Sequence, residues 1–280
     1  MSHTPTASPA SVAARRATFH RLHASGCFVM PNPWDVGSAR WLQGLGFAAL
    51  ATTSAGFAWS RGRADNGITR EMALAHLTEL VAATELPVNA DFENGFAADA
   101  AGVEESVRLA VGTGVAGLSI EDATGDAANP LFPLDEAVER LRAARRGIDR
   151  AGGDTLLVGR SEGFIVGRPD LDATIARLRA YAGAGADCLY APGLQTREQI
   201  VAVVEAVAPK PVNLLIGGPS DWTLDSVAAL GVRRISVGGA LARAAWGGFV
   251  RAAAALKEGR FDGFADAAPG RTLNGFFGGG

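Results

Sequence analysis

Short apolar runs alternate with helical patterns eight times along the chain, and this alternation restricts the fold more than any other feature of the sequence. In the segments between the runs, apolar residues recur three and four positions apart, which is the period of an amphipathic helix. Strand–helix alternation of this kind produces a parallel sheet covered by helices. The predicted strands occupy residues 27–30, 47–52, 88–92, 117–121, 155–160, 187–191, 212–216 and 234–237.

Eight repeats without a break favour an α/β fold of the closed (β/α)8 TIM-type barrel over an open doubly wound sheet. The GxGxxG pattern of dinucleotide-binding folds does not follow the first predicted strand, which disfavours that alternative. The predicted helices occupy residues 36–45, 70–84, 98–112, 134–150, 171–183, 196–207, 223–230 and 241–258. We therefore predict a flexible lead over residues 1–19, a single barrel domain over residues 20–258 and a C-terminal tail over residues 259–280.

Four phenylalanines stand among Gly and Ala in the predicted tail: Phe261, Phe264, Phe276 and Phe277. Leaving four phenyl rings in water is unfavourable, because burial of each apolar side chain stabilises a protein. The rings therefore pack either on this chain or on a neighbouring subunit, and the sequence leaves both open.

The composition excludes several classes of protein. A formal net charge of -3 argues against a dedicated nucleic-acid binder, and 48% hydrophobic residues argue against a disordered chain. No apolar run reaches the roughly 18–20 residues of a membrane span, so we expect no membrane partner. Only two cysteines occur, Cys27 and Cys188, which favours a reducing compartment. The acid-poor N-terminus is compatible with a transit peptide or with a short disordered lead followed by a surface helix, and we expect a cytoplasmic protein.

Charged residues gather where three of the predicted strands end. Asp91 and Glu93 close the third strand, Glu121 closes the fourth, and Arg160 and Glu162 close the fifth. Residues two apart in an extended segment point to the same face. In a (β/α)8 barrel the chemistry lies at the carboxyl ends of the strands, so these side chains are the candidate site.

Three of these carboxylates, those of Asp91, Glu93 and Glu121, lie on neighbouring strands and repel one another unless something compensates their charge. A hard divalent cation does so, and carboxylate oxygens suit Mg²⁺, with Mn²⁺ as the second choice. The alternative is that the acids cap the following helices or pair with arginine. Zinc fits poorly, because none of the four histidines falls at a predicted strand end.

Five short motifs occur in an order that resembles the isocitrate lyase/phosphoenolpyruvate mutase superfamily over about residues 20–258. The motifs are Pro-Asn-Pro-Trp-Asp at 31–35, Thr-Ser-Ala-Gly at 53–56, the Asp91/Glu93 pair, Ser-Ile-Glu-Asp at 119–122 and Gly-Arg-Ser-Glu at 159–162. The resemblance implies an α/β barrel with bound Mg²⁺ that makes or breaks C–C or C–P bonds through an enolate of pyruvate or a related acid. It also implies a homodimer or homotetramer whose eighth helix packs against a partner.

The resemblance assigns roles to individual residues. Asp91, Glu93 and Glu121 would hold Mg²⁺, partly through water. Arg160 would bind a carboxylate or the enolate oxygen, and Glu162 would orient Arg160 or contact the metal shell. The remaining implied roles are a loop acid near the metal for Asp65, substrate-carboxylate binding for Thr53, Ser54, Ala55 and Gly56, and contact with the far end of the substrate for Asn213. Trp34 stands in the loop after the first predicted strand, where it either excludes water from the site or caps the barrel rim.

One departure from the superfamily affects the expected chemistry. Isocitrate and methylisocitrate lyases carry a Lys-Lys-Cys-Gly-His loop after the fourth strand, whereas residues 122–130 of this chain contain no Cys, Lys or His. Cys27 and Cys188 are predicted to be buried packing residues. Asn129 falls near a position where the mutases carry an Asn, which keeps C–P chemistry open.

These observations predict a Mg²⁺-dependent lyase that cleaves a C–C bond of a small 2-oxo or 2-hydroxy di- or tricarboxylic acid through a pyruvate-type enolate. Oxaloacetate decarboxylase-like and alkylmalate or methylisocitrate lyase-like reactions both satisfy this description. The first alternative is C–P chemistry of the phosphoenolpyruvate mutase or phosphonopyruvate hydrolase type. The second is a carboxylate-binding protein of the same fold without catalysis.

Overall fold

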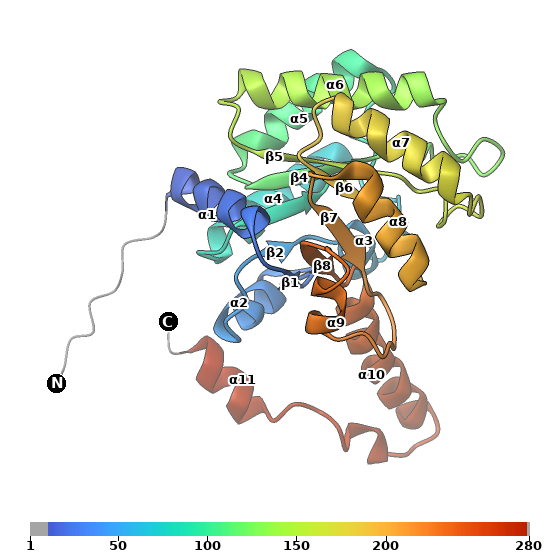
Figure 1. Ribbon diagram of the computed structural model, residues 1–280. Helices are drawn as coiled ribbons and strands as arrows, with labels where there is room; N and C mark the ends of the chain where they lie inside the picture. Colours follow the sequence, from blue (N-terminus) through green and yellow to red (C-terminus); the bar gives the residue numbers. More distant parts are fainter. Residues whose placement is uncertain (1–10, 279–280) are drawn as a thin grey trace.

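The computed structural model describes residues 11–278, and its eight parallel strands form a nearly closed barrel (Figure 1). The hydrogen-bonded order is β1-β8-β7-β6-β5-β4-β3-β2, and a bond from the Ala51 amide to the Pro31 carbonyl (3.0 Å) joins the two remaining edges. The prediction of a (β/α)8 barrel is confirmed. The strands are β1 (Phe28–Met30), β2 (Leu50–Ala51), β3 (Val88–Asp91), β4 (Gly117–Glu121), β5 (Leu156–Arg160), β6 (Cys188–Tyr190), β7 (Val212–Leu215) and β8 (Arg234–Ser236).

Helices surround the sheet and cover its outer face. Most begin at a Thr, Ser or Asp whose side chain accepts a hydrogen bond from the first turn, as Thr196 does from the Gln199 amide (3.3 Å). The helices are α1 (Val12–Ala24), α2 (Val36–Gly44), α3 (Ser54–Ser60), α4 (Arg70–Ala83), α5 (Ala100–Gly112), α6 (Leu134–Arg150), α7 (Leu171–Gly183), α8 (Arg197–Val207), α9 (Leu224–Ala228), α10 (Ala240–Lys257), the short 3₁₀ turn η1 (Asp262–Phe264) and α11 (Gly270–Phe277).

The first helix corrects one sequence prediction. A flexible lead over residues 1–19 is expected, but residues 12–19 belong to α1; residues 1–10 lie outside the described residues. Ser11 caps the helix, and Phe19 is fully buried against the N-terminal end of the barrel. Arg16 donates to the carbonyls of Val115 (3.0 Å) and Val111 (2.9 Å). These contacts show that α1 covers the floor of the barrel. Its polar, arginine-rich sequence does not indicate this role.

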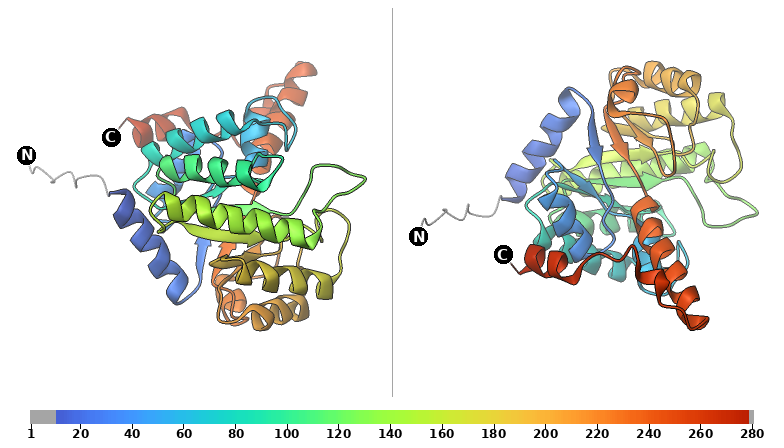
Figure 2. Two further views of the ribbon diagram at one scale, coloured as in Figure 1. Left: turned by 90° about the horizontal axis from the view of Figure 1, so that it is seen from above. Right: turned by 90° about the horizontal axis from the view of Figure 1, so that it is seen from below.

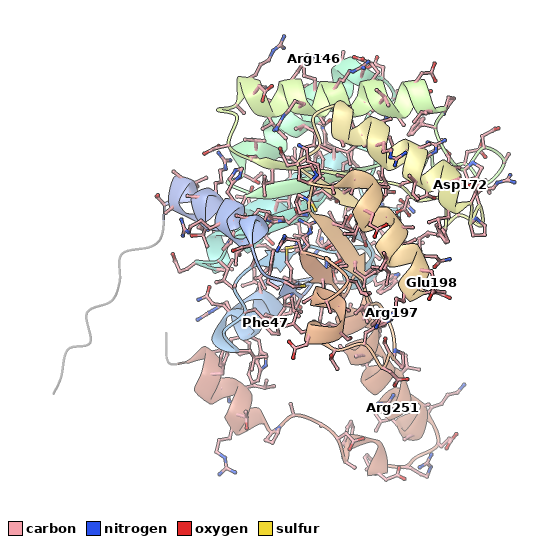
Figure 3. All side chains as sticks on the ribbon, in the orientation of Figure 1. Phe47, Arg146, Asp172, Arg197, Glu198 and Arg251 are labelled. Carbon is pink, nitrogen blue, oxygen red and sulfur yellow. The ribbon has the colours of Figure 1, made fainter. Side chains whose placement is uncertain are left out.

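The helix after β8, α10, points away from the barrel instead of lying along it (Figures 1 and 2). Its nearest packing partner in the chain is η1, and Phe249 remains 62% exposed. Arg251 lies on the projecting part of this helix (Figure 3). The chain then returns, so that α11 lies against α2, where the rings of Phe276 and Trp41 are 4.5 Å apart between centroids.

The tail phenylalanines therefore divide into two pairs. Phe276 and Phe277 cover this chain by packing on Trp41, whereas Phe261 is 73% exposed and Phe264 is about half exposed. The sequence left open whether the rings pack on this chain or on a neighbouring subunit. Phe276 and Phe277 pack on this chain, whereas Phe261 and Phe264 are left without a cover in the described residues.

The structure also shows how deeply the two cysteines are buried. Cys188 is buried, as predicted, but Cys27 is only half-buried because it precedes β1 at the edge of the barrel. Among residues 11–278, no helix combines the length and apolar character needed to cross a membrane.

Candidate active site

A cavity of about 170 Å³ opens at the carboxyl ends of the strands and reaches down into the barrel. Its walls combine hydroxyls, carboxamides, acids and two arginines. Among its lining residues are Thr53, Ser54, Ala55, Asp65, Asn89, Asp91, Arg160, Tyr190, Asn213, Arg234 and Ser236. A second hollow of about 470 Å³ lies above it, between the loops that follow β4 and β5, and Ser54, Asp65 and Arg160 line both. Arg160 therefore stands at the boundary between the two spaces.

Arg160, the last residue of β5, is the hub of the site. Its Nη1 lies 3.0 Å from Asp91 Oδ1 and 3.0 Å from Glu121 Oε2, and its Nε donates to Glu162 Oε1 at 2.5 Å. Burial opposes the charge of this guanidinium, but Glu121, Glu162 and Asp91 together raise the pKa of Arg160 above its usual range. The guanidinium carbon also lies 5.3 Å from the centroid of the Tyr190 ring, so three carboxylates and one aromatic ring hold the side chain.

The predicted Thr-Ser-Ala-Gly turn is the beginning of α3. Thr53 is the N-cap, and its Oγ1 accepts a hydrogen bond from the Gly56 amide (3.2 Å). Both the amide and the hydroxyl of Ser54 donate to Asp91 Oδ2 at 2.9 Å. Thr53, Ser54 and Ala55 line the cavity, whereas Gly56 is buried beneath it, where an added Cβ would lie 2.7 Å from the Thr53 methyl group.

Glu93 differs from the sequence prediction in one respect. An extended backbone was the reason to place it on the same face as Asp91, but β3 ends at Asp91 and Glu93 has a φ of 46°, in the left-handed region. The turn nevertheless leaves the side chain near Asp91 and only 8% exposed, with Oε1 lacking a hydrogen-bond partner. Burial, with help from the Asp91 and Asp65 charges, raises the pKa of Glu93 to about 8.

The pKa values of three other acids of the site are also raised. Burial raises the pKa of Glu121 well above its ordinary value, and Arg160 only partly offsets this effect. Burial likewise raises the pKa of Glu162. Desolvation and the neighbouring Asp91 charge raise the pKa of Asp65, whose loop overhangs the cavity. Five acids therefore surround Arg160, and no other cation forms an ion pair with Asp91, Glu121 or Glu162 within residues 11–278.

The excess of negative charge around Arg160 raises the question of whether a divalent cation fits this cluster of acids. The donors are carboxylate oxygens, which hard cations prefer, and Glu93 Oε1 is buried without a partner. In the described part of the chain, however, no three Asp, Glu, His or Cys side chains stand close enough together to form a ready ligand set. Asp91 and Glu121 turn toward Arg160 instead. The residue chemistry fits a divalent cation, and its binding requires these carboxylates to turn from the guanidinium.

Asp122 is a buried acid to which the sequence assigned no role beyond its place in a motif. Its Oδ1 accepts the Glu162 amide (2.7 Å), and its Oδ2 accepts the Tyr181 hydroxyl (2.5 Å) and Arg177 Nη1 (3.1 Å). This network fixes the backbone of Glu162, which in turn holds Arg160. The spacing of Tyr181 and Arg177 on α7, four residues apart, is the one sequence signal that could have suggested a shared partner.

The remaining predicted residues divide between the cavity and its surroundings. Asn213 is buried in the cavity wall, where it donates to Ser236 Oγ (2.9 Å). Asn129 is exposed and bonds within its own loop, to Asp126 Oδ2 (3.2 Å), so it lines neither hollow. Trp34 lies outside the cavity, in a shallow hollow that it shares with Trp246 and Phe249 of α10.

Comparison with known proteins supplies the final observations on the site. The sequence profile of the phosphoenolpyruvate phosphomutase family matches residues 19–257. A protein of Burkholderia cenocepacia J2315, described only provisionally as a lyase/mutase, is 49% identical, with a TM-score of 0.92 and coverage of 95% of this chain and 97% of that chain. Oxaloacetate acetylhydrolase in complex with its product oxalate is 26% identical, with a TM-score of 0.83 and coverage of 94% and 93%. An oxaloacetate decarboxylase of Rhodopseudomonas palustris (strain BisB5) is 32% identical over 205 residues, which cover 68% of each sequence.

Proposed function

The chain belongs to the phosphoenolpyruvate phosphomutase family, within the isocitrate lyase/phosphoenolpyruvate mutase superfamily, and we propose that it is a metal-dependent carbon–carbon lyase. Its substrate is a small 2-oxo or 2-hydroxy di- or tricarboxylic acid, and the reaction passes through a pyruvate-type enolate. The observation that carries this proposal is the position of Arg160 at the mouth of the cavity, among acids whose charge it cannot balance alone.

We assign the cation to Asp91, Glu93 and Glu121, with Mg²⁺ preferred and Mn²⁺ as the second choice. When bound, the cation neutralises the acids and stabilises negative charge on the 2-oxo oxygen of the substrate. Glu93 fits this role because its buried Oε1 has no other partner and because burial favours its neutral form in the absence of a cation.

The residues of the chain perform the remaining tasks. Arg160 binds the substrate carboxylate or the developing enolate oxygen, with two N–H groups in the fork geometry that suits two oxygens. Glu162 holds Nε of Arg160 and so fixes the direction of that fork. Ser54 and Thr53 present hydroxyls to the same end of the substrate. Asp65 overhangs both hollows and lies where a loop acid would help to exclude water.

The names of two relatives favour an oxaloacetate-like substrate, since one is an oxaloacetate decarboxylase and the other an oxaloacetate acetylhydrolase. The absence of a Cys in residues 122–130 agrees with a reaction that needs no thiol acid in that loop. Burial raises the pKa of the Cys188 thiol, and Cys188 lies within β6 instead of a loop. Asn129, the residue that suggested C–P chemistry, bonds within its own loop, so we favour C–C cleavage.

We also propose that the protein is a homodimer or a larger homo-oligomer. The support is α10, whose Trp246, Phe249 and Val250 are exposed on a helix that points away from the barrel (Figure 2). Large exposed apolar patches mark interaction sites. Sedimentation of the wild type and of Phe249→Asp tests this: the variant is expected to sediment as a smaller species, and an unchanged mass would contradict the interface.

The proposed reaction is tested with purified protein and a panel of oxaloacetate, 2-alkylmalates and 2-methylisocitrate. We expect pyruvate release from at least one of them, loss of turnover with EDTA and recovery with added Mg²⁺. A panel without turnover, or turnover indifferent to EDTA, contradicts the proposal. Phosphonopyruvate and phosphoenolpyruvate, followed by phosphorus NMR, test the C–P alternative in the same preparation.

A further inference from the structure

A second arginine lies at the floor of the cavity and is not used by the reaction described above. Arg234 is the first residue of β8 and is only 2% exposed, yet it lines the same cavity as Asp91 and Arg160. Within residues 11–278 it forms no ion pair with an acid, in contrast to Arg160. A buried charge without a counter-charge is costly, and proteins rarely keep one without a use for it.

The groups around Arg234 are neutral hydrogen-bonding partners. Its Nε donates to Asn213 Oδ1 (2.9 Å), and its Nη1 lies 3.3 Å from both Asn89 Oδ1 and His23 Nε2. Burial and the Arg234 charge lower the pKa of His23 to about 3, so this histidine is neutral. The Nη2 group has no hydrogen-bond partner in the part of the chain that the structure describes. Two N–H bonds of a buried cation are therefore free at the cavity.

The depth of Arg234 follows from its partners. It bonds to Asn89 on β3, and Asn89 precedes Asp91 by two residues on the same strand. At about 3.3 Å per residue, Asn89 lies roughly 6.6 Å deeper than Asp91. Residues two apart on a strand point to the same face, and both line the cavity. The cavity therefore has two ends. The proposed metal ligands and Arg160 lie at its mouth, and Arg234 lies deeper by about the length of two strand residues.

We propose that Arg234 forms an anion subsite that binds the distal carboxylate of a four-carbon dicarboxylic acid. The inference rests on the proposed function, because it takes the mouth of the cavity as the place where the 2-oxo acid end binds. A carboxylate on Nη2 supplies the missing counter-charge and forms a charge-assisted hydrogen bond. A four-carbon dicarboxylate spans the two ends, whereas oxalate, with two carbons, fills only the mouth. Arg234 thus selects for substrates with a second carboxylate.

Binding of succinate and of oxalate to the Mg²⁺-loaded protein, measured by isothermal titration, tests the subsite without any turnover. In Arg234→Gln, we expect succinate affinity to fall about 10- to 100-fold, as for a lost hydrogen bond to a charged group, while oxalate affinity stays within about 2-fold. Arg140→Gln is the matched control, because Arg140 is also buried, its hydrogen bonds go to the carbonyls of Asn94, Ala97 and Ala98, and it does not line the cavity.

A second variant covers the case in which Arg234→Gln does not fold. Asn213→Asp keeps the acceptor for Arg234 Nε and gives the guanidinium an internal carboxylate, and the Ser236 hydroxyl can donate to the new oxygen. We expect this variant to fold and to lose succinate affinity with oxalate affinity preserved.

Equal loss of succinate and oxalate in both variants, or unchanged succinate binding, overturns the subsite. Failure of the proposed reaction looks different: the wild type then turns over none of the panel but still distinguishes succinate from oxalate through Arg234. A crystal structure with succinate adds a direct check, since one carboxylate is expected within hydrogen-bond distance of Arg234 Nη2, and succinate bound elsewhere would contradict the proposal.

Discussion

Replacement of Arg160 by Gln removes the one positive charge that pairs with Asp91, Glu121 and Glu162 in the described residues. Removal of one partner from a buried ion pair costs about 3–5 kcal/mol. The burial-raised pKa values of Glu121 and Glu162 allow these acids to take up protons in response, so we expect a loss near the lower limit, about 3 kcal/mol. At roughly 2–4 °C per kcal/mol for a chain of this size, Tm falls by about 6–12 °C.

For the same variant we predict lower stability without metal but tighter binding of Mg²⁺. Without Arg160, the proposed ligands Asp91 and Glu121 no longer face a guanidinium and do not have to leave it to bind a cation. Mg²⁺ should therefore bind more tightly and raise Tm by more than it does in the wild type. A tenfold gain in affinity adds about 1.4 kcal/mol of stabilisation at saturating metal. Activity should nonetheless fall by about 10²–10³-fold, as for loss of a donor to developing negative charge.

Thermal melts with EDTA and with Mg²⁺ provide the assay, on the wild type, Arg160→Gln and Arg160→Lys. The Lys variant keeps the charge and should lose less stability. Arg16→Gln serves as the control, because Arg16 is buried at the barrel floor, where it bonds to the Val111 and Val115 carbonyls, so its loss should lower Tm without a change in the Mg²⁺ response. If Arg160→Gln melts like the wild type in EDTA, or responds to Mg²⁺ no more strongly than the wild type, the electrostatic reasoning is refuted.

Three further predictions concern residues outside the metal end of the site. Tyr181→Phe removes the 2.5 Å hydrogen bond to Asp122, and we expect about 1–2 kcal/mol lower stability in urea and a lower kcat with unchanged KM, because Asp122 holds the backbone of Glu162. Burial lowers the pKa of His76 from 6.5 to about 4, so the unfolded state binds more protons and stability is lost as pH falls through that window; His76→Gln should remove this loss of roughly 3 kcal/mol in melts at successive pH values. Phe276→Ala removes the ring packed 4.5 Å from Trp41, and faster protease cleavage within residues 259–269 is expected, with the barrel left intact. Unchanged kcat, a pH profile like that of the wild type, or unchanged cleavage would contradict these three expectations in turn.

The barrel was predictable because its sequence pattern is local. Strands such as 117–121 are continuous apolar runs, and the boundaries of β4 agree with the prediction residue by residue. A surface helix after the lead was expected, but the early start and the burial of α1 were missed, because they depend on long-range bonds such as those from Arg16 to Val111 and Val115. A polar helix that covers the barrel floor has the composition of a surface segment, so its role cannot be predicted from the local sequence pattern.

The candidate site was predictable to the extent that strand ends converge. That rule placed Asp91, Glu121 and Arg160 near one another, and the structure brings them within ion-pair distance. It did not predict the left-handed turn at Glu93, which depends on the loop after β3. It also gave no role to Arg234, because this residue begins a strand, and its function depends on a cavity that reaches down to the opposite end of the sheet.

The central claim is that this site stabilises a pyruvate-type enolate with a divalent cation and Arg160. Proton exchange tests it without knowledge of the natural substrate: pyruvate is incubated with the protein in D₂O, and loss of its methyl proton signal is followed by NMR. We predict exchange that requires Mg²⁺, stops with EDTA and slows by about 10²–10³-fold in Arg160→Gln. Exchange no faster than in buffer with folded, Mg²⁺-loaded protein, or exchange that persists in EDTA, would contradict the account.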